Sequence, residues 1–151
     1  MTASVAERRI KKELQKLRNA REELGMTVEV GSSPIEWFVT IIGAVDTVFA
    51  GEIYRIRIRF PANYPIEAPE VVFMPPAPLH PHIYTNGHIC LSILYDEWSP
   101  ALTIQSVCLS ILSMLSSCTA KEKPSDNDQY VRKIGRGSPK TTIWAFHDDT
   151  V

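Results

Sequence analysis

HPHIYTNGHICLSIL, residues 80–94, places a cysteine, Cys90, after a glycine-containing turn and beside three histidines and an asparagine. No regular hydrophobic period runs through this stretch, so we expect an irregular connection rather than a helix or a strand. Irregular segments that a rigid scaffold holds in place are where reactive groups concentrate. We therefore take this stretch as the candidate functional site.

Spacing alone leaves three interpretations of this cysteine open. Zinc accepts histidine and cysteine ligands, but the pattern H-x-H-x5-H-x-C lacks the paired x2–4 spacing of structural zinc sites. A thiol protease would need a histidine and an orienting amide, which His88 and Asn86 supply only if the fold brings them to the thiol. The third interpretation is a small buried core residue, which composition by itself favours.

The region before this stretch predicts a helix followed by a sheet. Ile10, Leu14 and Leu17 recur at helical spacing within residues 3–20, among many basic residues. Residues 36–43, 52–60 and 70–74 are rich in β-branched and aromatic residues, as strands are. The second of these strands alternates apolar residues with Arg55, Arg57 and Arg59, so one face of the sheet covers a core and the arginine face is outside.

The flanking segments complete an α+β architecture. Most of the 11 prolines fall in residues 61–81, which predicts a stiff, extended connection without sheet pairing. Thr103 can cap a largely buried helix running to about residue 117, and a short helix is expected near residues 127–134. We expect one domain over residues 1–151, with residues 136–151 as a flexible C-terminal tail, because Gly135, Gly137 and Pro139 interrupt regular structure.

Composition limits the classes of partner. The chain has 151 residues and a formal net charge of −1, so no overall field favours nucleic acid or an anionic membrane. Three cysteines without paired spacing fit a reducing compartment, and no stretch resembles a signal peptide or a membrane span. We expect a cytoplasmic or nuclear protein that binds neither nucleic acid nor membrane.

Four elements together resemble the ubiquitin-conjugating enzyme family over residues 9–130. They are a proline-rich YPxxxP element in YPIEAPEVVF, the HPx turn, the GxICL cysteine segment, and the WSPAxT loop in WSPALTIQSVCLSIL, in family order and spacing. The resemblance implies the ubiquitin-conjugating fold: an N-terminal helix, an antiparallel meander sheet, an irregular active-site segment, a central buried helix and a short C-terminal helix. It implies that Cys90 accepts ubiquitin as a thioester from the activating enzyme. No cofactor or metal is expected, because ATP is used by the activating enzyme.

The resemblance also implies partner surfaces. The first helix, with Arg9 on its basic face, would meet the activating enzyme and a RING-type or U-box ubiquitin ligase. Ile66 and the Ser99, Pro100 and Ala101 loop would complete the ligase platform. In the family the outer face of the sheet can bind a second ubiquitin, a contact that the three arginines flanking Phe38 and Ile42 make doubtful here. A different class with the same fold is a non-catalytic ubiquitin-binding scaffold, but such relatives lack the cysteine.

Departures from the family pattern refine the expectation. His82 stands where most members have an asparagine that supports the reacting oxygen, and Ser92 stands where most have an aspartate. The acidic gate position falls at Glu122, which Asp126 or Asp128 could replace. These departures, with the C-terminal HDDT at residues 147–150, resemble the W-type ubiquitin-conjugating enzymes, which place ubiquitin on the α-amine of a substrate's first residue.

Acid–base chemistry makes that acceptor plausible. At cytosolic pH about a quarter of α-amines are deprotonated, against about a thousandth of lysine side chains. A site that lacks groups to take a proton from lysine therefore still meets α-amines that are already nucleophilic. Lysine side chains remain the alternative acceptor. Two hypotheses stand for His82: it replaces the asparagine as a hydrogen-bond donor, or it only holds the turn.

Overall fold

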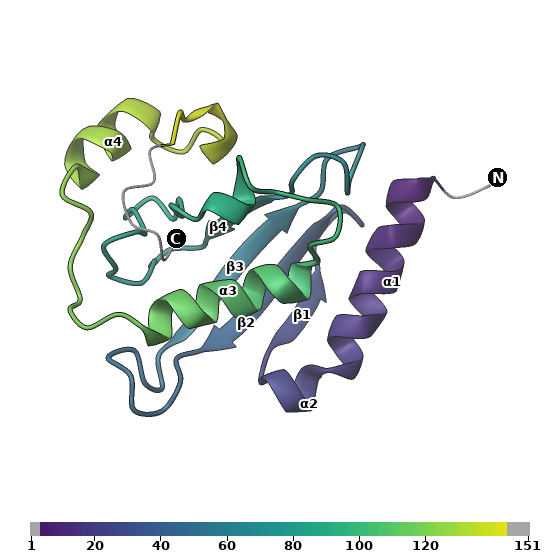
Figure 1. The fold of residues 1–151 in the computed structure, drawn as a ribbon, viewed down its shortest axis with the longest axis horizontal. Helices are drawn as coiled ribbons and strands as arrows, with labels where there is room; N and C mark the ends of the chain where they lie inside the picture. The colour runs from purple at the N-terminus through teal and green to yellow at the C-terminus, as the bar shows by residue number, and fades with distance from the viewer. Residues whose placement is uncertain (1–3, 145–151) are drawn as a thin grey trace.

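The computed structural model describes residues 4–144 and confirms the α+β class (Figure 1). Four strands form an antiparallel sheet in the order β1-β2-β3-β4, so each strand pairs with the next along the chain. The elements are α1 (Val5–Asn19), α2 (Arg21–Leu24), β1 (Thr27–Val30), β2 (Glu36–Ile42), β3 (Ile53–Arg59), β4 (Glu70–Phe73), the 3-10 turn η1 (Ser92–Leu94), α3 (Ile104–Ser116), α4 (Asn127–Ile134) and the 3-10 turn η2 (Pro139–Thr141).

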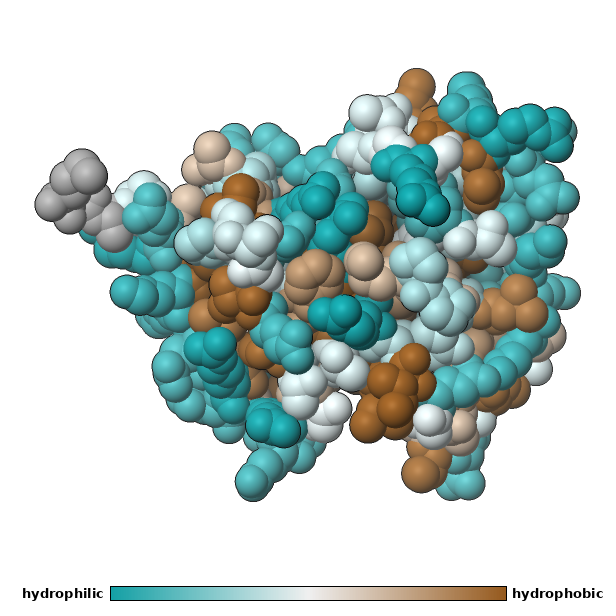
Figure 2. All heavy atoms as spheres, turned by 180° about the vertical axis from the view of Figure 1, so that it is seen from behind, coloured by the Kyte–Doolittle hydropathy of each residue, from teal (hydrophilic) through white to brown (hydrophobic). Residues whose placement is uncertain are grey.

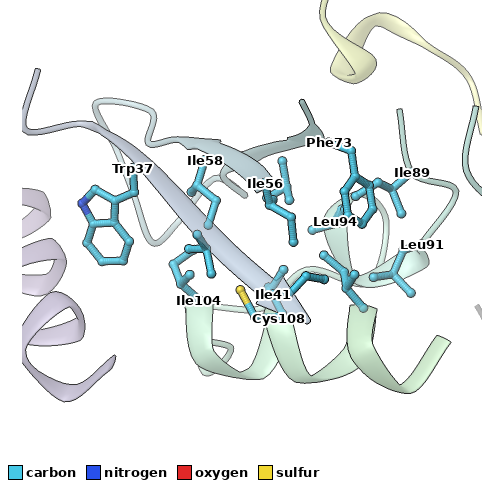
Figure 3. Packing of buried hydrophobic residues seen from close by; sticks show 14 of the residues in the cluster. Trp37, Ile41, Ile56, Ile58, Phe73, Ile89, Leu91, Leu94, Ile104 and Cys108 are labelled. Carbon is cyan, nitrogen blue, oxygen red and sulfur yellow. The ribbon is translucent and has the colours of Figure 1, made fainter. Parts of the chain in front are cut away.

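The core lies between the sheet and α3, which crosses one face of the sheet (Figure 1). Alternation places Trp37, Ile56 and Ile58 on that face, where they are completely buried, and the side chain of Cys108 on α3 points toward the sheet (Figure 3). Thr103 caps α3 by accepting a hydrogen bond from the Ser106 backbone N–H at 3.1 Å. No helix within residues 4–144 is long and apolar enough to cross a membrane.

Helix α1 lies beside β1 and is tied to the rest of the molecule by a buried carboxylate (Figure 1). Glu13 accepts hydrogen bonds from the Tyr64 hydroxyl at 2.6 Å, the Ile104 backbone N–H at 2.7 Å, and the Arg9 Nε at 2.7 Å. A buried carboxylate is tolerated only where hydrogen bonds satisfy it, and here it receives three. Glu13 therefore joins α1, the proline-rich connection and the start of α3.

Besides the two 3-10 turns, α2 and β1 were not predicted from the sequence. Helix α2 has four residues, and β1 has four residues that are exposed or only half-buried. Segments this short show neither a helical nor a strand period. Strand β1 is specified by its pairing with β2, in which Val28 lies opposite Val39, rather than by its own pattern.

The outer face of the sheet carries the predicted arginines, and each pairs with a carboxylate of another strand: Arg57 and Arg59 with the adjacent strands, and Arg55 with β1, two strands away. Their partners are Glu29 for Arg55 at 3.6 Å, Glu70 for Arg57 at 3.4 Å and Glu36 for Arg59 at 3.0 Å. The Arg55 guanidinium also covers the Phe38 ring, 4.6 Å from its centroid. Hydrophilic residues interrupt the hydrophobic ones across this side of the molecule (Figure 2).

The end of the described chain packs back toward the irregular segment around Cys90. Residues 138–144, which we call the C-terminal strap, contain η2 and are held by the side chains of Ser138, Lys140, Thr142 and Trp144. This part of the stretch predicted as a flexible tail is therefore packed against the domain. The HDDT sequence at residues 147–150 lies outside the described residues.

Candidate active site

The position of Cys90 follows from a glycine turn and two backbone contacts. Gly87 has φ +91°, and a Cβ atom there would meet the Phe73 carbonyl oxygen at 2.1 Å, so only glycine fits. The Phe73 backbone N–H donates to the Gly87 carbonyl at 2.9 Å, which attaches the turn to β4. The Cys90 backbone N–H then donates to the His82 carbonyl at 2.8 Å. Cys90 is thus fixed between the sheet edge and the histidine turn.

His80 holds that turn in place. Its ring is buried, its Nδ1 accepts a hydrogen bond from the His82 backbone N–H at 2.9 Å, and its Nε2 donates to the Met114 carbonyl at 3.1 Å. Burial lowers the pKa of His80 to about 4, so the ring is neutral at physiological pH. His80 is therefore a structural link between the turn and α3, and it places His82 beside the thiol.

Cys90 opens into a crevice of about 430 Å³ with three walls. The histidine turn, with Pro81 and His82, forms one wall, residues 124–126 form the second, and residues 142–144 of the C-terminal strap form the third. Tyr84 and Tyr130, whose rings stack with centroids 4.0 Å apart, also line it. A small group that enters this crevice can reach the thiol.

The Cys90 thiol is held in its protonated form. Burial, and secondly the negative charge of Asp126, raise the pKa of Cys90 to about 11. The thiolate is the nucleophile, and a raised pKa makes it scarce at neutral pH. The site therefore lacks the electropositive surroundings of a strongly activated cysteine.

Asp126 is the acidic candidate that the structure brings to this crevice. Its two carboxylate oxygens accept from the Tyr84 hydroxyl at 2.9 and 3.1 Å. Glu122 lines a neighbouring hollow, on the side of the histidine turn where Cys118 lies. Asp128 is largely exposed and pairs with Lys123 at 3.8 Å. Of the three residues proposed for the gate position, only Asp126 lines the Cys90 crevice.

The histidine and the asparagine considered for a metal or protease site make other contacts in the structure. The His88 Nδ1 lies 2.7 Å from the Tyr130 hydroxyl, and the Asn86 amide donates to the Gly135 carbonyl at 2.7 Å, so both side chains serve the packing of the C-terminal region. Among the residues that the structure describes, no three histidine, cysteine or acidic side chains form a metal-binding group. Ser92 is buried and donates to the Glu97 carboxylate at 3.0 Å.

The residues predicted for the ligase platform lie on two neighbouring loops. Ile66 is 72% exposed, Pro100 and Ala101 are exposed, and Ser99 is half-buried. The Trp98 indole N–H donates to the Pro65 carbonyl at 2.9 Å, which joins the two loops. A partner can therefore reach Ile66, Pro100 and Ala101, and their role in binding a ligase stays a prediction.

Arg9 has an internal role that the sequence did not predict. Its guanidinium donates to the carbonyls of Pro100 and Leu102, both at 2.9 Å, besides its contact with Glu13. Arg9 therefore fixes the second loop against α1. A partner that binds Arg9 directly would meet a side chain already engaged by three acceptors.

Sequence reasoning missed the aromatic cluster next to the crevice. Tyr84, Tyr95, Tyr130 and Trp144 come from four separate segments, with Trp144 stacked on Tyr95 at 4.8 Å between centroids. None of these residues belongs to a spaced motif, so the only available signal was the concentration of aromatics near residues 84–95 and 130–144. The C-terminal strap packs against the domain through this cluster.

Comparison with known proteins identifies the family. The family model described as "Ubiquitin-conjugating enzyme" matches residues 9–138. The chain belongs to the ubiquitin-conjugating enzyme family, and it is a ubiquitin-conjugating enzyme of the kind that works, as these enzymes generally do, with ubiquitin, an activating enzyme and ligases.

Individual relatives confirm the predicted resemblance to the W-type group. The chain is 47% identical over 151 residues to a probable ubiquitin-conjugating enzyme E2 W from Dictyostelium discoideum, with 100% of each chain covered. It is 49% identical over 148 residues to a probable E2 W-A from Danio rerio, covering 95% of this chain and 97% of the relative. A ubiquitin-conjugating enzyme crystal structure from Agrocybe aegerita superposes with a TM-score of 0.85 at 44% identity, covering 91% of this chain and 100% of that one.

Proposed function

We propose that Cys90 carries ubiquitin as a thioester and that the enzyme transfers it to the N-terminal α-amine of protein substrates. The observation that carries the proposal is the Cys90 crevice, in which a thiol of raised pKa faces an open hollow beside His82. Of the three cysteines, Cys108 is completely buried and Cys118 does not line this crevice. These positions support Cys90 as the thiol that is used for transfer.

Two exchange steps follow from this placement. In charging, the Cys90 thiolate attacks the carbonyl carbon of ubiquitin's thioester on the activating enzyme; a new C–S bond forms and the other thiolate leaves. In discharge, an amine attacks the same carbonyl, a C–N bond forms and the C–S bond to Cys90 breaks. The amine loses its proton to the departing thiolate or to water. No oxidant, metal or cofactor enters either step.

Because the pKa of Cys90 is raised, the rate of transfer depends on how much of the acceptor amine is deprotonated. A thiolate whose conjugate acid has a high pKa is a poorer leaving group, so the thioester is less reactive toward weak nucleophiles. An α-amine is already about a quarter free base near pH 7.4, whereas a lysine side chain is almost wholly protonated. Cys90 is a poor leaving group, and no residue is dedicated to deprotonating the amine. Transfer is therefore expected to favour the α-amine, because a larger fraction of it is already deprotonated.

Lysine transfer remains a second candidate because of Asp126. Its carboxylate lines the crevice and retains acceptor capacity beyond the Tyr84 hydrogen bond, so it could attract a lysine ammonium and take its proton. The two candidates differ in their dependence on this carboxylate. Transfer to an α-amine should need Asp126 little, and transfer to lysine should need it strongly.

The expected partners and location extend this proposal. The activating enzyme and a RING-type or U-box ligase would bind α1 and the loops at Ile66 and Pro100. Both of these loop residues are exposed. Substrates would present free N termini. A thioester carrier needs Cys90 reduced, and all three cysteines are free thiols in the structure, so we place the enzyme in the cytoplasm or nucleus.

The thioester is tested by charging. The enzyme is mixed with activating enzyme, ubiquitin and ATP, and an adduct that reducing agent removes is sought by gel electrophoresis. We expect one adduct, absent in Cys90→Ala and retained in the matched variant Cys118→Ala. Without an adduct, or with one that Cys90→Ala keeps, the chain would be a ubiquitin-binding scaffold of the same fold.

The acceptor is tested by discharge of the charged enzyme. One peptide is free of lysine and has a free N terminus, and the other is N-acetylated with a single lysine. We expect transfer to the first to exceed transfer to the second at equal concentration, in the wild type and in Asp126→Asn. Transfer confined to the acetylated peptide, and abolished by Asp126→Asn, would establish lysine as the acceptor.

The same assay decides between the two hypotheses for His82. His82→Asn restores the amide found at this place in most members of the family, and His82→Ala removes the side chain. A change in the ratio of α-amine to lysine transfer in His82→Asn would assign His82 a selective role. An unchanged ratio, with equal stability of the variant, would leave it as a residue that holds the turn.

A further inference from the structure

The C-terminal strap separates two hollows on the same side of the molecule. One is the Cys90 crevice, and the other, of about 520 Å³, is lined by Ile66, Glu67 and Trp98 of the ligase loops and by Tyr95. Residues 142–144 line both hollows. The strap is therefore a partition with the reacting thiol on one side and the predicted ligase platform on the other.

One lysine fastens this partition to the ligase loop. Lys140 Nζ donates to the Glu67 carboxylate at 2.6 Å and to the Ala68 carbonyl, and these two acceptors directly follow Ile66 in the sequence. The Lys140 side chain is only 26% exposed, so the contact is partly shielded from water. Lys140 belongs to the strap and contacts the loop that carries the exposed Ile66.

The remaining attachments of the strap flank Lys140 on both sides. Before it, the Ser138 hydroxyl donates to the Glu70 carboxylate at 2.7 Å. The Thr142 hydroxyl lies 2.9 Å from the Tyr130 hydroxyl, and Trp144 stacks on Tyr95. The described contacts of residues 142–144 with the domain are thus with the aromatic cluster, while Lys140 holds the connection to the loop. Lys140 thus connects the loop at Glu67 to the segment that forms one wall of the Cys90 crevice.

We propose that Lys140 is a positioning residue that sets the width of the Cys90 crevice, and that a ligase bound at Ile66 widens the crevice by releasing Lys140 from Glu67. The inference rests on the proposed function of Cys90. A partner that covers Ile66 also reaches the next residue, Glu67, whose side chain is half exposed. Cations of that partner compete with Lys140 for the carboxylate, and the released strap admits larger acceptors.

The size of the effect follows from the kind of contact. Exposed ion pairs shift an equilibrium by up to about fivefold, and this pair has one half-exposed member and one additional carbonyl acceptor. We therefore expect a change of about threefold in transfer to bulky acceptors. Small amines already fit the crevice, so their transfer should not change.

The test compares acceptors of two sizes in enzyme charged with ubiquitin, without ligase. The small acceptor is glycinamide, and the bulky acceptor is a lysine-free peptide that begins with two branched apolar residues. Lys140→Glu and Glu67→Lys should each raise the ratio of bulky to small transfer about threefold. The double variant, which restores an opposite-charge pair, should return at least half of that change. Lys133→Glu, on the exposed side of α4, is the matched control and should change nothing.

Ligase dependence completes the test. A RING domain that stimulates the wild type should stimulate bulky transfer less in Lys140→Glu, because the strap is already released. Equal changes for both acceptors, no restoration in the double variant, or unchanged ligase stimulation would each overturn the proposal. Failure of charging would instead refute the role of Cys90, so the two failures are distinguishable.

Discussion

The histidine turn and the C-terminal strap are two walls of the same crevice, but they are held by different forces. The turn is fixed by the buried His80 ring, which bonds a backbone group on each side, and by the attachment of Gly87 to β4. The strap is held at the surface by a lysine, the hydroxyls of Ser138 and Thr142, and a stacked indole. Buried, fully satisfied hydrogen bonds are costly to break, and exposed pairs are not.

The two walls meet two different requirements of the reaction: the histidine turn positions the thiol, and the strap borders the opening through which the acceptor enters. The thiol must stay at a fixed position relative to His82, and the Cys90 backbone is bonded to the turn and not to the strap. The acceptor must enter and leave, and it does so next to the wall with the weaker attachments. One rigid and one adjustable wall let the enzyme keep its reacting atom in place while its opening changes.

The largest expected effect comes from breaking the fixed wall. His80→Ala removes the acceptor of the His82 N–H and one of the two donors to the Met114 carbonyl, which keeps the Ser117 hydroxyl, and it opens a cavity beside Phe49. We therefore expect a loss of about 3 kcal/mol in the free energy of unfolding. Urea denaturation followed by circular dichroism measures it. A loss no greater than that of Thr142→Ala, the matched change in the strap, would contradict the contrast between the walls.

The second effect concerns the thiol that the fixed wall holds. Because the thiolate reacts and the pKa of Cys90 is raised to about 11, alkylation of Cys90 by iodoacetamide should rise about tenfold per pH unit, or a hundredfold from pH 7 to pH 9. Peptide mass spectrometry reports the rate at this residue. Asp126→Asn removes one cause of the raised pKa and should speed the reaction, while Lys140→Glu should not. A rate that levels off above about pH 8.5 would show an ordinary thiol.

The sequence predicted the fixed wall better than the adjustable one. The β3 alternation, the Thr103 cap and the histidine turn follow from local patterns whose physical cause is visible in a few neighbouring residues. The strap depends on contacts of Lys140 with Glu67 and of Trp144 with Tyr95, which lie 49 or more positions apart and have no period or spacing. For the same reason Asp126 could not be chosen over Glu122 and Asp128 before the fold was known.

An intermediate effect is expected where the strap meets the buried region. Tyr130→Phe removes the hydroxyl shared by His88 Nδ1 and Thr142, and leaves the nearly buried His88 ring with an unpaired nitrogen. We expect a loss of about 1–2 kcal/mol in the free energy of unfolding. Chemical denaturation measures it, with Thr141→Val, on the exposed side of η2, as control. A loss as large as that of His80→Ala would mean that the strap is as firmly held as the turn.

The smallest expected effect is that of salt concentration, which should weaken the contacts of the strap but not those of the histidine turn. The contacts of His80 involve a neutral ring, whereas the Lys140–Glu67 pair is partly exposed and is screened as the Debye length falls from about 14 Å at 0.05 M to about 4 Å at 0.5 M salt. Over this range we expect the ratio of bulky to small acceptor transfer to rise by up to about twofold in the wild type. Discharge assays at constant pH measure the ratio. Lys140→Glu, in which the pair is already broken, should show no such rise, so a rise of equal size in that variant would mean that salt acts elsewhere and that the strap is not held by charge.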